Sequence, residues 1–308
     1  MENSSIFNSR SRLLKLVPLV SCQNETEIHL LTELNNSKES ATLLKEIRDE
    51  NMEKLIKIRE RSMQLSLKNL SSLVFGLLNE SFALKNLQFN QISWENSSKE
   101  IAEFVRLNDR VRPVKDLKDL KKRLIGDFRC YGVFHEALKT PVSFVFIRLY
   151  KGLASNLLNL LNDVIEEPEH DSCVFYSISS PMRGLNGIEF GSKLIKNVTM
   201  TIQKEMPQIK TFATFSPITN FHAWLQKNSS DKYHHLVDLK TIQQVAEHES
   251  ELMTACAEYL NKNGTEDNVA RFHYRNGASL GPIRFAADPS PVSFKQSYGI
   301  QVNYIYYQ

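Results

Sequence analysis

Three of the 11 glycines in the chain lie close together, between a predicted strand and a predicted helix. Gly184, Gly187 and Gly191 would let the backbone approach a ligand closely, and the first N–H groups of a helix have no partners within that helix. The helix dipole adds partial positive charge and Arg183 a full one, so this turn suits a pyrophosphate group. The same spacing also occurs where glycines only permit a tight turn and close packing of a helix on a sheet, and the motif alone leaves both interpretations open.

A serine follows the next predicted strand, which covers residues 209–215. Open α/β sheets bind ligands at the carboxyl ends of their strands, which is where Ser216 is expected. Because Pro217 cannot continue the hydrogen-bond ladder, the strand must end or kink there and present Ser216 outward. A Ser-Pro pair at a strand end is more often a simple turn than a catalytic element.

His273 is the histidine with the most unusual surroundings. It lies between Phe272 and Tyr274 on a predicted core strand, residues 270–274, which ends in an Asn-Gly turn. Such surroundings can tune an imidazole pKa for proton transfer, although core histidines that bind a backbone carbonyl are commoner. On the last predicted strand Tyr304 and Tyr306 share one face, so that one of them is placed to line a pocket.

His234 and His235, near Asp231, have the residue types of a metal site. Adjacent residues rarely point at one ion, so we predict a surface loop there and no metal site. The four cysteines are widely scattered without a C-x-x-C pair, which argues against a zinc site and a disulfide scaffold and predicts reduced thiols: Cys22, Cys130, Cys173 and Cys256.

Helices dominate the first part of the chain and strands the second. Apolar residues at helical spacing over residues 25–80 predict two or three helices. Further predicted helices cover 99–107, 115–124, 153–167, 185–205 and 241–261, and the remaining predicted strands cover 128–134, 142–150, 173–179, 283–287 and 301–307. The strand, turn, helix and strand over 173–215 imply a crossover. We therefore predict an α+β protein, with a helical domain over 1–90 and a mixed β-sheet catalytic domain over 91–308.

Composition bounds the class of protein. The 308 residues are 42% hydrophobic and 24% charged, which excludes disordered, collagen-like and coiled-coil classes. The 38 Lys and Arg against 35 Asp and Glu give a net charge of +3, too balanced to predict a nucleic-acid footprint. The apolar stretches at 16–20 and 141–147 are far shorter than a membrane span, so integral membrane association is not expected.

The two ends of the sequence give a weak prediction of the cellular compartment. Basic and serine residues near the start resemble a transit peptide about as well as a frayed terminus: Ser4, Ser5, Arg10, Arg12 and Lys15. The last residues carry no peroxisomal Ser-Lys-Leu signal. We expect an intracellular protein, mitochondrial or cytoplasmic, with the peroxisome possible despite the missing signal.

Several separated motifs, in chain order, resemble the malonyl-CoA decarboxylase family. They lie at 175–179, 184–191, 194–196, 215–218, 272–273, 276–278, 287–288 and 303–306, with Phe221, Trp224 and Leu225 between them and weaker matches upstream at 92–94, 113–115 and 129–131. The resemblance covers about residues 90–308. It implies a catalytic domain similar to the GNAT-type N-acetyltransferase fold, in which a Gly-rich turn holds the CoA pyrophosphate.

The resemblance also implies roles for individual residues. Ser216 and His273 fall on the catalytic pair of the family, and Ser177, Glu189 and Tyr306 on its supporting active-site positions. The CoA-binding turn and helix start are matched by Arg183, Gly184, Asn186, Gly187, Ile188, Glu189, Phe190, Gly191 and Ser192.

The activity implied is conversion of malonyl-CoA to acetyl-CoA and CO2. Loss of CO2 leaves a thioester enolate that must be stabilised and then protonated, with His273 as the expected proton donor. No cofactor is expected besides the CoA thioester substrate, and the helices are expected to mediate a homo-oligomer. Two alternatives are an acyl-CoA-dependent acyltransferase, which would release free CoA, and an inactive paralogue that binds acyl-CoA.

The chain departs from the family pattern after the histidine. Where family members carry Trp-Arg-Ile-Asn-Trp, this sequence has residues 281–285, Gly-Pro-Ile-Arg-Phe, so that Pro282 removes a charge and a strand donor. Val292 replaces an arginine, and the helical region and the end of the chain are shorter than in the family. These changes indicate a divergent or shortened member.

Overall fold

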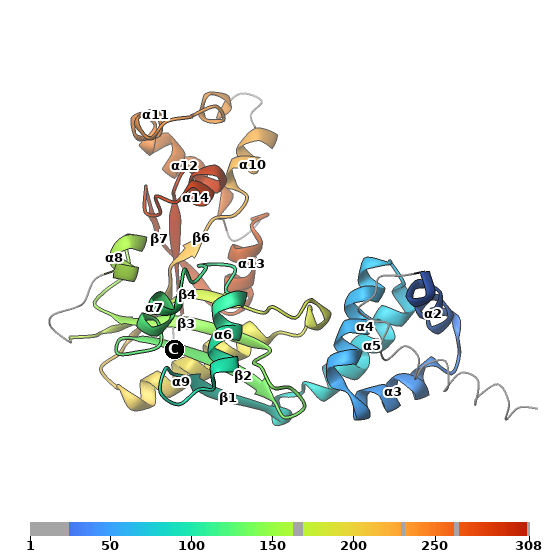
Figure 1. Ribbon diagram of the computed structural model, residues 1–308. Coiled ribbons are helices and arrows are strands. Elements are labelled where there is room, and N and C mark those ends of the chain that lie inside the picture. Colours follow the sequence, from blue (N-terminus) through green and yellow to red (C-terminus); the bar gives the residue numbers. More distant parts are fainter. Residues whose placement is uncertain (1–24, 163–168, 229–231, 262–264, 307–308) are drawn as a thin grey trace, which may run out of the picture. The chain divides into compact units, whose positions relative to one another are not determined.

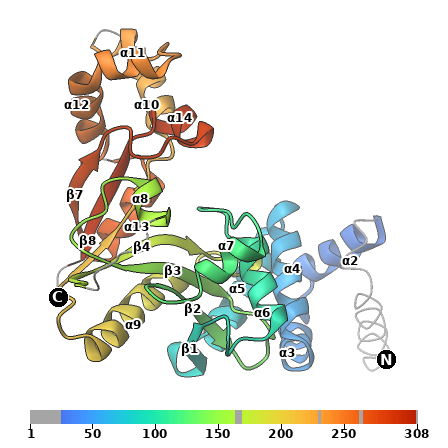
Figure 2. The same ribbon diagram turned by 60° about the vertical axis from the view of Figure 1, so that its left-hand side comes forward.

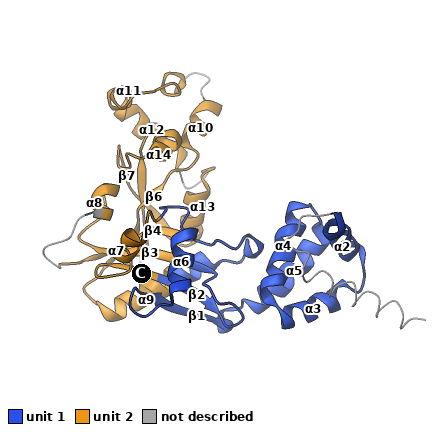
Figure 3. Ribbon diagram, viewed as in Figure 1, with its two compact units in different colours: residues 1–113, 131–144, 179–194 blue, residues 114–130, 145–178, 195–308 orange. Residues whose placement is uncertain are grey.

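The computed structural model describes residues 25–162, 169–228, 232–261 and 265–306 (Figure 1). The chain forms two compact units, each made of three stretches (Figure 3). The first unit takes 1–113, 131–144 and 179–194, and the second takes 114–130, 145–178 and 195–308. The domain boundary expected near residue 90 stays a prediction.

The described part of the first unit begins with four helices, where the sequence predicts two or three over residues 25–80. These are α2 (Glu25–Asn36), α3 (Ser40–Glu50), α4 (Met52–Gln64) and α5 (Lys68–Ser81). The periodic stretch is cut because the Asn51 side chain accepts a hydrogen bond from the Lys54 N–H (3.0 Å) and so caps α4. Ser66, at φ 57°, separates α4 from α5. The buried faces of the four helices form the core of this region: Leu31, Leu44, Leu55, Ile58, Val74 and Leu78.

A strand and a helix follow the four helices in the same unit. After the short 3-10 helix η1 (Leu84–Asn86), β1 (Leu87–Ile92) is a strand that the sequence analysis missed, because polar residues separate its two buried ends. Helix α6 (Lys99–Asn108) is where it was predicted, with Ser98 as its N-cap. Strands β2 (Phe128–His135) and β3 (Ser143–Tyr150) are also as predicted and have residues in both units.

The Gly-rich turn begins with the 3-10 helix η2 (Arg183–Leu185), and α9 (Phe190–Glu205) starts five residues later than predicted. Between η2 and α9, Gly187 adopts a positive φ of 94°, which is not helical and which glycine accommodates most easily. Within the first unit, η2 packs on α4: Arg59 Nη1 donates to the Gly184 carbonyl (2.6 Å). A Cβ atom on Gly184 would overlap the Ile56 carbonyl oxygen, so the close approach of the turn to α4 requires glycine there.

Gly184→Ala is therefore expected to lower the free energy of unfolding by about 1–3 kcal/mol, because backbone must shift to admit the methyl group. Gly76→Ala is the matched control, since Gly76 lies inside α5 with open space around it; it should stabilise by roughly 0.5–1 kcal/mol. Urea unfolding followed by circular dichroism measures both. Equal effects of the two substitutions would contradict the close packing of η2 on α4.

The second unit contains a mixed sheet, as predicted. Strand β4 (Ser172–Ser179) pairs in parallel with β5 (Thr211–Thr214), while β5, β6 (Ser216–Pro217) and β7 (Ala278–Arg284) all pair antiparallel with β8 (Gln301–Tyr306). The long β7–β8 pair extends toward the helices of this unit (Figure 2). The α+β class, with helices first and a mixed sheet after them, is confirmed.

The ladder along β8 is interrupted between β5 and β6. The observed strand β5, Thr211–Thr214, is therefore shorter than the strand predicted over 209–215. The register is the same on both sides of the gap, with Ala213 opposite Ile305 and Ser216 opposite Val302. In the gap, hydrogen bonds of the Thr214 and Asn303 side chains take the place of hydrogen bonds between the two backbones. The Tyr304 N–H donates to Thr214 Oγ1 (3.0 Å).

Strand β7 contains a bulge within residues 281–285, where the sequence departs from the pattern of the family it resembles. Its bounds are Ala278–Arg284 rather than the predicted 283–287, and the register shifts between Leu280 and Ile283. Proline is tolerated at a bulge because the ladder needs no N–H there, which explains Pro282. A Cβ atom on Gly281 would come within 2.7 Å of the Asn303 carbonyl oxygen, so the bulge also needs a glycine.

The strand predicted over 270–274 is wrong: residues Asn268–Arg275 form helix α13. The Asp267 side chain accepts from the N–H groups of Val269 and Ala270 (both 2.9 Å) and starts the helix. Gly277, at φ 86°, follows its last turn. The aromatic residues that suggested a strand are here spaced along a helix.

The other helices of the second unit gather mainly at one end of β7 and β8 (Figures 1 and 2). The helix predicted over 241–261 is two, because a capping box at Thr241 starts α11 and His248 separates α11 from α12. Residues of α10, α12 and β8 share one buried apolar cluster. Besides α13 and most of α9, the helices described in this unit are α7 (Leu117–Lys122), α8 (Leu157–Asn162), α10 (Phe221–Lys227), α11 (Ile242–Glu247), α12 (Glu249–Tyr259) and α14 (Pro291–Ser297), together with the 3-10 helix η3 (His234–Leu236).

Some predictions concern residues outside the described ranges. These are the N-terminal segment with Cys22, Asp231 and the last part of the helix predicted over 153–167. Cys130, Cys173 and Cys256 are buried free thiols, as predicted. Among the helices of the described residues, none has the length and apolar character needed to cross a membrane.

Candidate active site

The second unit brings Ser216 and His273 together. Ser216 Oγ on β6 lies 3.4 Å from His273 Nε2 on α13. Ser216 is 6% exposed and His273 3% exposed, so both side chains are largely removed from water. The prediction that Ser216 points outward is wrong. The strand does end at Pro217, but the Ser216 side chain is buried against His273 of α13.

A second hydroxyl fixes the direction of the Ser216 hydroxyl. Ser216 Oγ donates to Thr214 Oγ1 (2.9 Å), which also accepts from the Tyr304 N–H. The Thr214 carbonyl accepts from Asn303 Nδ2 (2.8 Å). Thr214 therefore holds Ser216 from one side while its own position is fixed by β8.

The other nitrogen of the imidazole meets a phenol. His273 Nδ1 lies 2.7 Å from the Tyr306 hydroxyl, and the Tyr304 ring stacks on the imidazole at 4.6 Å between ring centroids. Burial lowers the pKa of His273 to about 3 and raises the pKa of Tyr306 well above its ordinary value. Both groups are thus uncharged near pH 7.

The hydrogen-bond directions follow from these protonation states. Because Ser216 uses its own proton on Thr214, Ser216 Oγ is an acceptor for a proton on His273 Nε2. With that proton on Nε2, Nδ1 of the neutral imidazole is an acceptor, and the neutral Tyr306 phenol donates to it. The network runs in one direction from Tyr306 through His273 and Ser216 to Thr214.

A buried carboxylate positions both members of the pair. Asp267 is fully buried, and while its Oδ1 caps the helix of His273, its Oδ2 accepts from the Thr219 N–H and the Thr219 hydroxyl (both 3.2 Å). Thr219 lies three residues after Ser216. The Tyr259 hydroxyl of α12 also donates to Oδ2 (3.2 Å).

The altered stretch in β7 reaches the same network. Arg284 Nε donates to Asn303 Oδ1 (3.2 Å), and Asn303 binds the Thr214 carbonyl through its amide nitrogen. Asn303 lies opposite the bulge, between the partners of Leu280 and Ile283. The stretch that the sequence analysis singles out as a departure is therefore connected to Ser216 through Asn303 and Thr214.

The remaining predicted site residues are distributed over the two units. Ser177 is buried on β4 of the second unit, two residues beyond Phe175, whose ring meets the Tyr306 ring edge-on. The Gly-rich turn and Glu189 belong to the first unit. In that turn the exposed residues are Arg183, Asn186, Gly187 and Glu189, whereas Gly184, Ile188, Phe190 and Gly191 are buried and Ser192 is half-buried.

Thr214 and Asp267 are the site residues that sequence reasoning missed. Asp267 carried a usable signal, since an Asp before an amphipathic run predicts an N-cap, but the strand prediction concealed it. Thr214 carried none, because its role depends on the gap in the ladder along β8.

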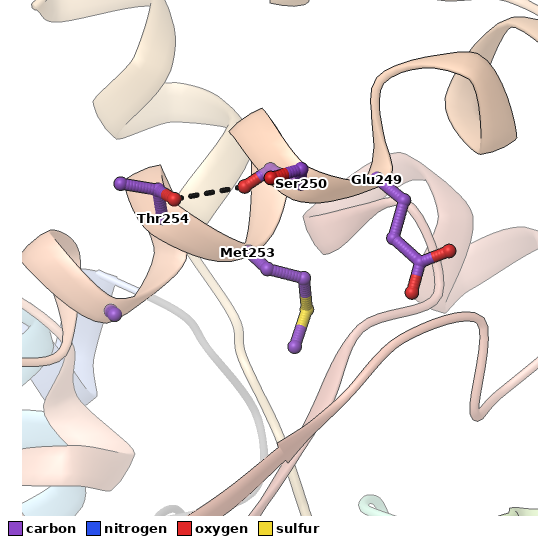
Figure 4. Close-up of a pocket in the computed structure, with 5 residues that line it drawn as sticks. Glu249, Ser250, Met253 and Thr254 are labelled. Carbon is purple, nitrogen blue, oxygen red and sulfur yellow. Dashed lines mark hydrogen bonds between the residues drawn. The ribbon is translucent and has the colours of Figure 1, made fainter.

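A shallow hollow of about 710 Å³ lies along α12 and is a different feature (Figure 4). None of the predicted site residues lines it; its lining residues are Glu249, Ser250, Met253, Thr254 and Ala257. It offers one carboxylate and short polar groups on a single helix. This is less suited to chemistry than the buried pair.

Comparison with known proteins identifies the family. The malonyl-CoA decarboxylase C-terminal domain family matches residues 85–308, almost three quarters of the chain. The chain belongs to the malonyl-CoA decarboxylase family. Its fold is that of the malonyl-CoA decarboxylase crystal structure from Agrobacterium vitis, with a TM-score of 0.80 and 26% identity over 97% of this chain and 80% of that one.

Two further relatives agree with this family assignment. The malonyl-CoA decarboxylase structure from Rhodopseudomonas palustris has a TM-score of 0.71 and 27% identity, covering 98% of this chain and 80% of that one. The mitochondrial malonyl-CoA decarboxylase of Anser anser anser is 29% identical over 78% of this chain. The chain spans 56% of the length of that curated relative.

In this decarboxylase-family chain, Asp267→Ala is expected to lower the free energy of unfolding by roughly 2–4 kcal/mol, because it removes a cap and leaves buried donors unpaired. Asp116→Ala is the matched control: Asp116 also caps a helix, α7, but is exposed, and its loss should cost only about 0.5–1 kcal/mol. Urea unfolding measures both. Similar costs for the two variants would argue against the positioning role of Asp267.

The lowered pKa of His273 makes stability depend on pH. Between pH 6.5 and about 3 the unfolded chain binds a proton on this histidine that the folded chain does not, so stability falls as the pH falls through that window. His273→Gln removes this effect and should reduce the loss of stability between pH 7 and pH 5 by up to about 2 kcal/mol. The control is His234→Gln, a change at an exposed histidine, which should lose as much stability between pH 7 and pH 5 as the unaltered protein does in urea titrations. If His273→Gln also lost as much stability as the unaltered protein, the buried neutral imidazole would be refuted.

Proposed function

We propose that this chain is a carboxy-lyase that converts malonyl-CoA into acetyl-CoA and CO2. The observation that carries the proposal is the buried Ser216–His273 pair, with the Tyr306 hydroxyl on the far nitrogen of the imidazole. Membership of the malonyl-CoA decarboxylase family supports the substrate. The relatives it matches bear that activity in their names.

The reaction sets two requirements on the protein. When the bond between the thioester α-carbon and the carboxylate breaks, its electron pair moves onto the α-carbon and the thioester oxygen as an enolate, and CO2 leaves. Hydrogen-bond donors aimed at that oxygen lower the barrier, and a positioned acid must then protonate the carbon. The net reaction consumes one proton for each CO2 released.

We assign proton delivery to His273. Its Nε2–H is the donor that faces Ser216, and Tyr306 can pass its own proton to Nδ1 as Nε2 gives its proton to carbon, so that the imidazole stays neutral. Tyr306 then regains a proton from solvent. A phenol is a far stronger acid than the methyl group of a thioester, so the transfer is downhill even with the raised pKa of Tyr306.

Ser216 is assigned the orientation of the thioester. Its proton is committed to Thr214 in the free protein, and rotation of the hydroxyl would instead direct that proton to the enolate oxygen. The exposed residues of the Gly-rich turn, together with the first N–H groups of α9, are assigned to the CoA phosphates. Glu189 and Ser177 are assigned supporting roles.

Two wider proposals follow from the family. We propose that the protein acts inside the cell, in the mitochondrion or the cytoplasm, since curated relatives carry the word mitochondrial in their names. We also propose self-association through α2 to α5. No cofactor is required beyond the CoA thioester itself.

The test is formation of acetyl-CoA and CO2 from malonyl-CoA by the purified protein. His273→Ala should lower kcat by about 100- to 10,000-fold, as expected for loss of a general acid. Ser216→Ala and Tyr306→Phe should also lower kcat, and Thr214→Val less so. His234→Ala, an exposed histidine of the same unit, should leave turnover unchanged.

The fate of the proton separates the proposed reaction from its alternatives. In D2O the acetyl-CoA formed should carry one deuterium in its methyl group. Release of free CoA thiol in the presence of an amine acceptor would instead indicate acyl transfer. A folded protein that binds malonyl-CoA without releasing CO2 would refute the decarboxylase proposal.

A further inference from the structure

Three metal-ligating side chains from separate parts of the second unit meet at the surface. His235 lies on η3, His248 lies between α11 and α12, and Glu251 lies in the first turn of α12. One potential ligand atom from each lies within 4.8 Å of the others. His235 Nε2 is 2.7 Å from Glu251 Oε2, and the two imidazole rings are 5.5 Å apart between centroids.

His248 is oriented as metal-binding histidines are. Its Nδ1 lies 2.9 Å from the Gln244 carbonyl oxygen, so Nδ1 carries the proton and donates to that carbonyl. The lone pair is therefore on Nε2. A backbone carbonyl on one nitrogen fixes the tautomer and ring orientation that leave the other nitrogen available to a metal ion.

An ordinary ion pair accounts for only part of this cluster. The short contact between His235 and Glu251 could be a surface salt bridge. His248, however, makes no hydrogen bond to either residue in the described structure. Its ring nevertheless lies beside that of His235, tilted by 48°, and it stands three residues before Glu251 at the start of the helix.

We propose that His235, His248 and Glu251 bind one divalent transition-metal ion of the zinc type. Two imidazole nitrogens and one carboxylate oxygen are a donor set that suits Zn²⁺ and its neighbours rather than Ca²⁺ or Mg²⁺, which prefer oxygen ligands. Water would fill the fourth position. This site differs from the one considered and rejected in the sequence, where the adjacent His234 and His235 were paired with Asp231.

The bound ion would tie η3 to the corner between α11 and α12. The capping box of α11 and contacts of α10 with η3 and α12 also hold that corner. Because α12 also provides Tyr259 to Asp267, the ion would stabilise an element of the framework around His273. The site lies outside the proposed catalytic network and does not depend on that proposal.

The test uses full-length protein without an affinity tag, stripped of metal with a chelator and then titrated with ZnCl2 in a calorimeter. We expect one Zn²⁺ per chain, a rise in the thermal midpoint with added Zn²⁺, and binding that weakens as the pH falls because protons compete for the imidazoles. Co²⁺ in place of Zn²⁺ should give the visible absorption of a four-coordinate site.

The variants decide which residues hold the ion. His235→Ala, His248→Ala and Glu251→Gln should each weaken Zn²⁺ binding at least tenfold and abolish the thermal shift, with unchanged circular dichroism in the absence of metal. His234→Ala, an exposed neighbour outside the cluster, and His29→Ala, which removes a two-residue His–Glu pair in the first unit, should bind as the unaltered protein does. Absence of Zn²⁺ binding, or binding that survives both His235→Ala and His248→Ala, would overturn the proposal.

Discussion

The buried carboxylate of Asp267 is the interaction on which the candidate site depends. One oxygen starts helix α13, which carries His273, and the other holds the segment that follows Ser216. A carboxylate without water must find donors, since burying it unpaired would cost several kcal/mol. The need to satisfy this one group therefore brings a helix and a strand end to the same place, and with them the two side chains of the pair.

The gap in the ladder along β8 provides the second constraint. Between β5 and β6, side chains bind backbone groups of the sheet: Asn303 donates to the Thr214 carbonyl, and Thr214 Oγ1 accepts from the Tyr304 N–H. The sheet therefore continues in register. The hydroxyls of Thr214 and Ser216 lie next to each other at this gap. Burial also decides the protonation of the two titratable groups beside these hydroxyls. It keeps His273 and Tyr306 neutral, while the bond from Ser216 to Thr214 sets the direction of the other hydrogen bonds.

The departures of this chain from its family have a structural context. The Gly281–Pro282 pair forms a bulge rather than breaking β7, because proline and glycine are both accommodated where the ladder is already irregular. Beyond the bulge, Arg284 donates a hydrogen bond to the Asn303 side chain, and Asn303 donates one to the Thr214 carbonyl. The contacts between these positions and Ser216 are therefore indirect and pass through Asn303 and Thr214.

The sequence by itself determined the helical first part, most strands of the mixed sheet, the Gly-rich turn and, through its resemblance, the residues Ser216 and His273. These signals are local or carried by motifs. Only the tertiary structure decided that residues 268–275 form a helix, that Ser216 is buried, and that Thr214 and Asp267 support the pair. The physical reason is that an aromatic run fits a strand or a helix equally well by local propensity, so burial decides between them. Asp267 caps the helix locally, but its second oxygen is satisfied by Thr219, 48 residues away in the chain, and the sequence does not show that contact.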